Sequence, residues 1–366
     1  MDGFEIDSAD DSSGIWTSVT KSSTPTLSYQ SSLKRTGSGA LRCLSAANSR
    51  NIYLTQTLAS TYTEVYGGFG FRWASTTTLS EGHAGSGVTM LALVSSGGTT
   101  QLSMTLDQTT NVLRIYKGTP NDNVLLGSSS TAVTADTWCY IEFHFLISDT
   151  VGVVQLKLNS TLVLDLSSQD TNVADTNIKT VQFGIPPAGG TPATNAGGGT
   201  CDFYYDDFII NDTTGSVSNS WPNGAGIEKL VPNADGNYTA WTSTGGAVDY
   251  TEIDDVTTYG NLPDDDTTTI LSSTLNQRTS VNLSATTIAG TVEAIMLCTY
   301  AKNSAAGADE MGHGVRLSGV DYESETFVPA TTYGWQKKVV TLNPGTSARW
   351  TTSQLDGMEK VFRRAT

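Results

Sequence analysis

Residues 138–166 read WCYIEFHFLISDTVGVVQLKLNSTLVLDL, and this stretch decides the fold of the chain. Polar and apolar side chains alternate over residues 139–146 and again over residues 153–158, which is the period-two pattern of half-buried strands. Asn159-Ser160 then supplies two turn-forming residues before the chain runs back as a further apolar strand. The stretch therefore predicts a long strand followed by a hairpin, which is the core of a β-sandwich. We expect the side chains of Trp138, Phe143, Leu156, Leu158 and Phe208 to be buried in this core.

Chain length and composition indicate more than one sheet domain. A chain of 366 residues exceeds what a single hydrophobic core usually organises, so we expect two domains. Hydrophobic residues make up 38% of the chain and charged residues only 15%, while Ser, Thr and Gly fill the difference. This balance is typical of sheet proteins with many short polar turns, so the fold class we expect is all-β with little helix.

The charge and hydropathy of the chain argue against two classes of partner. The formal net charge is −16, so long-range electrostatics disfavours binding to nucleic acid and to anionic membrane surfaces. The chain has no apolar run of about 18 residues, so we expect no membrane insertion. Met1–Glu5 lacks the basic and apolar regions of a signal peptide, so we expect synthesis in a cytoplasm.

The cysteines indicate neither a zinc site nor a disulfide framework. They are scattered along the chain with no close pair, at Cys43, Cys139, Cys201 and Cys298. We expect buried, reduced thiols that pack as small hydrophobic side chains.

Short strands bounded by Ser, Thr or Gly follow one another through the first part of the chain. An N-terminal strand is expected within residues 4–16. Further strands are predicted at residues 27–29, 37–44, 51–58, 64–73, 88–94, 102–106, 112–116, 124–127, 178–185 and 201–210. The long loop Pro186–Thr200 is rich in Gly, Pro and Ala, so it is a candidate contact loop or, alternatively, a disordered surface excursion.

Three features of this first part carry a resemblance to a known family. A Trp opens the strand WCYIEFHF, the hairpin VVQLKLNSTLVLDL turns at Asn159-Ser160, and residues 204–210 close the domain with YYDDFII. Together they resemble the concanavalin A-like (LamG-type) jelly roll. The D-G-F-E segment at residues 2–5, with a second sheet domain, resembles virion structural proteins of tailed bacteriophages. The resemblance implies a β-sandwich, but this fold hosts lectins, glycosidases and structural modules.

The chain changes character after residue 211. Residues 212–223, DTTGSVSNSWPN, have the composition of an interdomain joint. We therefore expect a concanavalin A-like β-sandwich over residues 1–213, a linker over 214–223, and a second β-sandwich that serves as a virion-attachment domain over 224–366. In this second domain, strands are predicted at residues 279–283, 290–301, 314–317 and 335–342. Thr351 and Gln354 have the spacing of a capping box, which predicts one helix at residues 352–358.

No catalytic constellation is visible in the sequence. Sandwich glycosidases need a Glu-x-Asp-x-x-Glu run that brings an acid and a nucleophile to one cleft, and the nearest string, Glu252–Thr257, lacks the second Glu. His83, His144 and His313 lie far apart, without a neighbouring metal ligand, base or nucleophile. We therefore expect a protein that is not an enzyme, with no catalytic residue, no cofactor-binding residue and no metal ligand.

Calcium is the one cation that the composition leaves open, since lectin sandwiches often hold it with Asp and Asn oxygens from loops. The candidate clusters are Asp206-Asp207, Asn121-Asp122-Asn123 and Asp264-Asp265-Asp266. Surface solubility is the alternative explanation for each of them, although three adjacent aspartates repel one another unless a cation lies near.

The sequence and the resemblance together favour a non-enzymatic virion structural protein, associated with the phage tail as a tip, fibre or adaptor and exposed on the particle. One alternative is a glycan-binding receptor module for host surface polysaccharide. Another is a capsid decoration protein. The expected partners are other virion proteins, further copies of this chain and, in the first alternative, a host glycan. The expected location is the virion.

Overall fold

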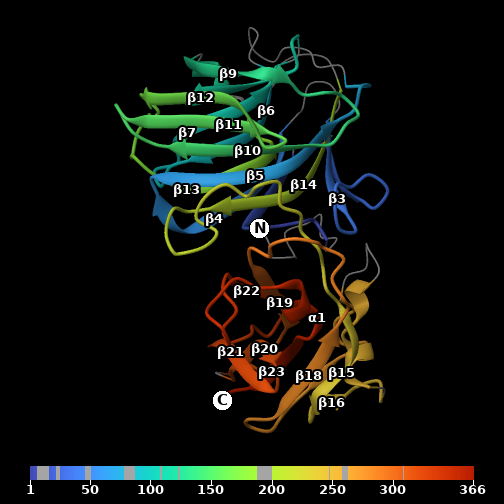
Figure 1. Cartoon of the computed structure of the whole chain (residues 1–366). Helices are drawn as coiled ribbons and strands as arrows, with labels where there is room; N and C mark the ends of the chain where they lie inside the picture. Colours follow the sequence, from blue (N-terminus) through green and yellow to red (C-terminus); the bar gives the residue numbers. More distant parts are fainter. Residues whose placement is uncertain are drawn as a thin grey trace. The chain divides into compact units, whose positions relative to one another are not determined.

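The first of two compact units is a sandwich of two seven-stranded antiparallel sheets, seen in the computed structural model in Figure 1. The structure describes the chain except for residues 6–15, 22–24, 46–50, 78–86, 108, 123, 188–199, 247, 258–262 and 308. The first sheet has the order β1 (Ser18–Lys21), β4 (Ile52–Tyr62), β13 (Ile178–Ile185), β6 (Val88–Val94), β7 (Thr100–Leu106), β8 (Val112–Lys117) and β9 (Val124–Ala132). The second has the order β12 (Thr161–Gln169), β11 (Gly152–Leu158), β10 (Cys139–Leu146), β5 (Glu64–Trp73), β14 (Cys201–Asn211), β3 (Ala40–Ser45) and β2 (Thr26–Gln30).

The stretch that decides the fold forms three neighbouring strands of the second sheet. β10 pairs antiparallel with β11, with Phe143 opposite Leu156, and β11 pairs in turn with β12. Asn159 and Ser160 have φ values of 49° and 68°. Both central residues of a type I′ hairpin turn need this left-handed conformation. The predicted strand and hairpin are therefore confirmed.

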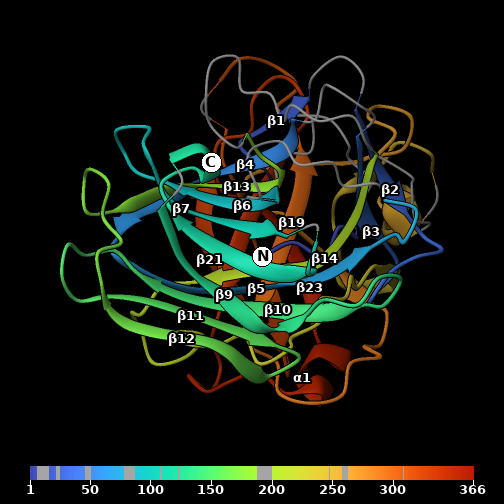
Figure 2. The same ribbon diagram turned by 90° about the horizontal axis from the view of Figure 1, so that it is seen from above.

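Aromatic side chains from both sheets fill the space between the two layers. Figure 2 shows the strands of these layers from above. Phe183 of β13 lies 5.0 Å from Phe69 of β5 and 4.7 Å from Tyr205 of β14, measured between ring centroids. All three side chains are inaccessible to solvent. The hydroxyl of Tyr205 donates a hydrogen bond to the carbonyl of Gly184, so this large side chain is buried without an unpaired polar group.

One expectation for the first unit is corrected, and two others fall mostly outside the described residues. Trp138 was expected in the core, but it is half-buried because it precedes β10 rather than lying within it. The N-terminal strand expected within residues 4–16 falls mostly outside the described residues, and the first strand of the described part of the chain is Ser18–Lys21. Asp2 forms an isolated antiparallel bridge with Phe208. The expected contact loop Pro186–Thr200 falls almost entirely outside the described residues.

The second unit is also built from antiparallel sheets, which confirms the all-β fold class. A five-stranded sheet has the order β15 (Pro232–Thr239), β18 (Arg278–Leu283), β23 (Glu359–Arg364), β20 (Met311–Leu317) and β21 (Val320–Phe327). Two further sheets have two strands each, β16 (Thr242–Ser243) with β17 (Ile270–Leu271) and β19 (Ile295–Ala301) with β22 (Gly334–Val340). Short 3-10 turns lie at Asp249–Glu252 and Asp255–Thr257 in this unit, and another lies at Pro120–Asp122 in the first unit.

The hydrophobic core of the second unit gathers around Trp350. This side chain is 2% exposed and packs in one cluster with Val292, Leu297, Val315, Leu355 and Met358. The helix α1 (Thr352–Asp356) begins at the predicted capping box, in which Thr351 and Gln354 bond to each other's backbone. No helix in the described ranges is long and apolar enough to cross a membrane.

The two compact units divide between Ile227 and Glu228, and Met1–Phe4 belong to the first unit. Residues 214–223 consequently belong to the first unit. Separate folding of residues 1–213 and 224–366, joined by a linker at 214–223, stays a prediction.

Replacing Leu156 with Ala should lower the free energy of unfolding by about 2 to 5 kcal/mol, because it leaves a cavity between the sheets at a side chain that is 0% exposed. Leu162→Ala is the matched control in the same hairpin, since Leu162 is 46% exposed and its loss should change stability by less than about 0.5 kcal/mol. Urea unfolding followed by circular dichroism measures both. Equal effects of the two substitutions would refute the strand register.

Candidate functional site

The candidate site lies on the second sheet of the first unit, which runs from β12 to β2. We call the side of this sheet that points away from the core the outer face. Side chains alternate along β5, so Phe69 and Phe71 enter the core while their neighbours point outward. β10 alternates in the same way around Phe143. The outward positions of the two strands are Tyr66, Gly68, Gly70, Arg72, Tyr140, Glu142 and His144.

Two glycines of β5 keep the middle of the outer face flat. A β-carbon at Gly68 would lie 2.7 Å from the ring of Tyr140, and one at Gly70 would lie 2.8 Å from Cδ of Arg35. Because neither glycine has a side chain, the Tyr140 ring and the Arg35 stem lie directly on the strand. The guanidinium of Arg35 stacks over the Tyr140 ring at 4.4 Å from its centroid.

A pair of buried carboxylates lies beside this stack, at a bulge in β14. Asp206 accepts hydrogen bonds from the backbone N–H groups of Arg35 and Thr36, at 2.7 and 3.2 Å. Asp207 accepts from the Arg35 guanidinium at 2.6 Å, and also from the Thr36 hydroxyl at 2.6 Å and the Ile227 backbone N–H at 2.7 Å. Both aspartates are inaccessible to solvent.

The two carboxyls have perturbed acidity. Burial, and then the neighbouring charge of Asp207, raise the pKa of Asp206 well above its ordinary value. Burial also raises the pKa of Asp207, against the opposing effects of its hydrogen bond from Thr36 and the charge of Arg35. The first calcium candidate is therefore an ion pair, in which a guanidinium already supplies the positive charge.

The other two calcium candidates have protein partners of their own. Asp122 accepts from the backbone N–H and hydroxyl of Thr119 at 2.7 and 2.8 Å, and Asn123 lies outside the described residues. In the third cluster the partners are Thr268 for Asp264, Tyr300 for Asp265 and Lys302 for Asp266. In the part of the chain that the structure describes, no group of three or more His, Cys, Asp or Glu side chains is arranged to hold a metal ion.

One row of polar side chains crosses the strands at one end of the outer face, and we call it the arginine row. Arg42 of β3 forms a two-point ion pair with Asp202, at 2.7 and 2.8 Å. Tyr204 lies between two guanidinium groups, with Arg42 5.5 Å and Arg72 5.2 Å from its ring centroid. Arg72 pairs with Asp136 at 2.8 Å. The row thus combines donors, acceptors and an aromatic ring.

A second row, the histidine row, crosses the other end of the same face. The imidazole of His144 stacks on the Tyr66 ring, with 4.0 Å between centroids and 5° between planes. Its ring nitrogens lie 2.7 Å from Glu64 and 2.8 Å from the amide oxygen of Gln155. The Gln155 amide nitrogen donates onward to Asp165 at 2.7 Å. His144 is therefore a member of a continuous polar network rather than an isolated surface residue.

Residues 212–227, which include the predicted linker at 214–223, cross the outer face over Glu142 and the histidine row, and we call them the crossing segment. Trp221 contacts Tyr66 and His144 edge-on, at centroid distances of 5.5 and 6.1 Å. The Lys157 ammonium lies 4.0 Å from the centroid of the indole ring. The backbone N–H of Asn223 donates to Glu142 at 2.7 Å.

Glu142 is completely buried beneath this segment. Burial raises the pKa of Glu142, and the hydrogen bond from the Asn223 backbone opposes that shift. The sequence analysis identified neither Glu142 nor Trp221 as part of a binding site.

The remaining sequence candidates do not join this site. His83 lies outside the described residues. His313 is buried in the second unit, 2.8 Å from the Thr299 hydroxyl, and burial lowers its pKa to about 4. Glu252, also in the second unit, accepts from the Gly245 backbone N–H at 3.0 Å and so braces its own loop.

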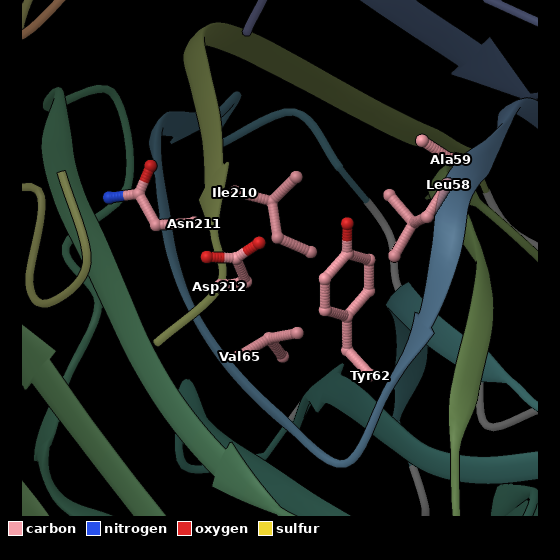
Figure 3. A pocket seen from close by; sticks show the side chains of 7 residues that line it. All are labelled: Leu58, Ala59, Tyr62, Val65, Ile210, Asn211 and Asp212. Carbon is pink, nitrogen blue, oxygen red and sulfur yellow. The ribbon is translucent and has the colours of Figure 1, made fainter. Parts of the chain in front are cut away.

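A pocket of about 110 Å³ opens at one end of the first sandwich, where β4, β5 and β14 meet (Figure 3). The phenol of Tyr62 and the carboxylate of Asp212 face this space in Figure 3. Its lining consists of Leu58, Ala59, Tyr62, Val65, Ile210, Asn211 and Asp212. Ligand pockets usually measure about 300 to 1,000 Å³, so this one is too small for a saccharide.

No protein-family model matches the chain, and no curated protein matches it significantly. Similar solved structures include an endo-β-1,4-glucuronan lyase from the fungus Trichoderma reesei, with 14% identity, a TM-score of 0.42, and coverage of 55% of this chain and 93% of the lyase. The alginate lyase Aly36B has 21% identity, a TM-score of 0.36, and coverage of 48% and 82%. The carbohydrate-binding module CBM66 from Bacillus subtilis has 7% identity, a TM-score of 0.33, and coverage of 56% and 98%.

Two of these three similar structures are polysaccharide lyases, which contradicts the expectation that the chain is not an enzyme. That expectation rested on the missing Glu-x-Asp-x-x-Glu run, which is a requirement of hydrolases. Elimination needs groups that transfer protons, and Tyr, His and Lys side chains serve that purpose as well as carboxylates. The absence of this hydrolase motif was therefore too narrow a criterion for excluding enzymatic activity.

Arg35→Ala should destabilise the first unit by about 3 to 5 kcal/mol near neutral pH, because it leaves Asp207 buried without its cation. In the folded state both carboxyls have pKa values above the value of about 3.9 in the unfolded chain. Their burial is therefore favourable while they are protonated at low pH, and the free energy of unfolding falls as rising pH ionises them. The penalty should therefore be larger at about pH 8 than at about pH 5, measured by urea unfolding.

The control for this substitution is Arg349→Ala, which removes a surface pair with Glu293 whose side chains are 40% and 34% exposed. It should cost less than about 1 kcal/mol at either pH. A penalty for Arg35→Ala that does not change with pH would contradict the role assigned to the buried carboxyls.

Proposed function

We propose that the first unit is a glycan-binding domain and that the arginine row is part of its ligand surface. A polysaccharide presents many hydroxyl groups, each of which donates and accepts hydrogen bonds. The row offers two guanidinium groups, two carboxylates and one phenol within a few ångströms of one another. This concentration of paired donors and acceptors on the outer face is the observation that carries the proposal.

The scaffold supports the same function. Arg42, Tyr204 and Arg72 lie opposite one another on β3, β14 and β5, so three hydrogen-bonded strands hold their spacing. Side chains on strands keep a binding geometry better than side chains on loops. The side chains of Arg42 and Arg72 are 29% and 13% exposed, so both have edges available to a ligand.

Charge favours a neutral glycan over an acidic one. The two cations of the row are balanced by Asp202 and Asp136, while the chain as a whole carries a formal net charge of −16. Long-range repulsion therefore slows the approach of a polyanion. Acidic glycans still belong in the test, because a lyase activity of this chain would act on a uronate polymer such as those named for the similar structures.

A place in a tailed-phage particle, on the tail or on the capsid surface, stays a prediction that rests on the resemblance. So do contacts with other virion proteins and assembly of several copies. A glycan-binding domain is compatible with either position on a particle, since several copies would raise the avidity of one weak site.

The proposed function is tested by binding of the full chain to laminarin, dextran, alginate and polyglucuronate, measured by isothermal titration calorimetry. Arg72→Ala should weaken binding of the preferred glycan by about tenfold, which corresponds to about 1.4 kcal/mol. Arg114→Ala is the matched control, because Arg114 forms a similar pair with Asp107 on the other sheet, at 2.9 Å. It should leave the affinity unchanged.

Each glycan is also assayed for new chain ends and for the ultraviolet absorbance of an unsaturated product. Chain cleavage that Arg72→Ala reduces would extend the proposal from binding to catalysis. Equal losses of affinity in the Arg72 and Arg114 variants would show that the arginine row has no special role. Lack of binding to any of the four glycans would count against the proposed function.

A further inference from the structure

The part of the outer face beneath the crossing segment is unlike a permanently buried contact. Tyr140, Glu142 and His144 point outward from β10 and are 2%, 0% and 8% exposed, although all three are polar and titratable. Surfaces that stay covered are usually apolar, because burying a polar group costs free energy unless it is fully hydrogen-bonded. This face therefore has the chemistry of a surface that meets a polar ligand.

Glu142 is not fully satisfied in this arrangement. Its Oε1 atom accepts from the Asn223 backbone N–H, whereas its Oε2 atom is buried and has no hydrogen-bond partner among the described residues. A buried acceptor without a donor is rare in native structures and costs about 1 to 3 kcal/mol. The covered face thus lacks a donor that a ligand hydroxyl would supply.

The crossing segment is tied down firmly at its downstream end. The Arg35 guanidinium donates to the carbonyls of Gly224 and Ala225 at 2.8 and 2.9 Å. Asp207 accepts from the backbone N–H of Ile227 at 2.7 Å. This anchor lies beside Asn223, so the segment remains attached to the outer face there even when its middle moves.

Its middle part is held more lightly. Residues 212–231 contain no strand or helix, and Trp221 meets the sheet through ring edges and the Lys157 ammonium rather than through a packed core. Upstream, the side-chain amide of Asn211 donates to the Ser220 carbonyl at 3.1 Å and closes the segment into a loop. Few buried contacts and no sheet pairing are the marks of a part of the chain that opens locally.

We propose that Trp221 and the Asn223 backbone occupy a saccharide subsite on the outer face, and that a bound glycan displaces them. This inference rests on the proposed glycan-binding function. A sugar ring presents C–H groups to the edges and faces of Tyr66 and His144, as the indole now does. Its hydroxyls replace the Asn223 N–H at Glu142 Oε1 and supply the donor that Oε2 lacks.

The crossing segment therefore competes with the ligand. Only the molecules in which the segment is open bind at this subsite, so the apparent affinity is the intrinsic affinity reduced by the open fraction. A substitution that frees the segment without touching the sheet should raise the apparent affinity, which is the opposite of what loss of a ligand contact does.

The test compares the full chain with its Trp221→Ala variant against laminarin, dextran, alginate and polyglucuronate by isothermal titration calorimetry. Trp221→Ala should bind the preferred glycan about tenfold more tightly, because the closed state loses its aromatic and cation contacts. Thr214→Ala is the control in the same segment, since Thr214 is exposed and bonds only to Asp212 in its own turn. It should bind as the unchanged chain does.

The outcomes separate this inference from the function on which it rests. Unchanged or weaker binding by Trp221→Ala, with normal binding by the unchanged chain, overturns the displacement and leaves glycan binding intact. Failure of both proteins to bind any of the four glycans overturns glycan binding itself.

Hydrogen exchange without ligand gives a second readout. The Asn223 amide should exchange at least tenfold faster in Trp221→Ala than in the unchanged chain, while the amides of β10 keep their protection. An Asn223 amide as protected as those of β10 in both proteins overturns the inference, because the segment then never opens alone.

Discussion

The outer face of the first unit depends on Arg35, whose guanidinium pairs with Asp207 and whose backbone N–H donates to Asp206, two aspartates that water does not reach. Removing a carboxylate from water costs several kcal/mol, and only a well-placed cation with further hydrogen bonds recovers it. Asp207 obtains both, from Arg35, Thr36 and the end of the crossing segment at Ile227. Asp206 obtains hydrogen bonds from the backbone N–H groups of residues 35 and 36. The same guanidinium lies flat over Tyr140 because Gly70 leaves room for its stem. One arginine thereby joins the sheet, a loop and the crossing segment.

The sequence predicted the strands of the first unit well because their signal is local. Alternation over residues 139–158 and the Asn159-Ser160 turn need no knowledge of distant residues, and β5, β6 and β13 have the predicted limits. The second unit was harder, because β23 carries charged residues at four of its six positions and so shows little alternation of polar and apolar side chains. Trp138 was misplaced for a related reason, since an aromatic residue that opens a strand need not enter the core.

The candidate site could not be predicted in the same way, because its residues become neighbours only through pairing of distant strands. Arg42, Arg72 and Tyr204 look like ordinary outward positions in the sequence, and only the order β5–β14–β3 brings them into a row. Trp221 was interpreted as part of a linker because its surroundings are polar and contain Pro. The search for catalysis looked for a carboxylate pair along one strand, and so it could not detect chemistry assembled across several strands.

That strand order also has a consequence for how the chain is made. β14 lies between β5 and β3, yet it follows both of them by a large part of the chain. While the ribosome is still synthesising the intervening residues, β3 and β5 each have an unpaired edge, and no neighbour along the chain can take the place of β14. Pairings between segments so distant in sequence form slowly, and open strand edges invite association between chains. The first unit is therefore expected to be most vulnerable to aggregation just before β14 leaves the ribosome, and a chain shortened before Cys201 would keep that vulnerability permanently.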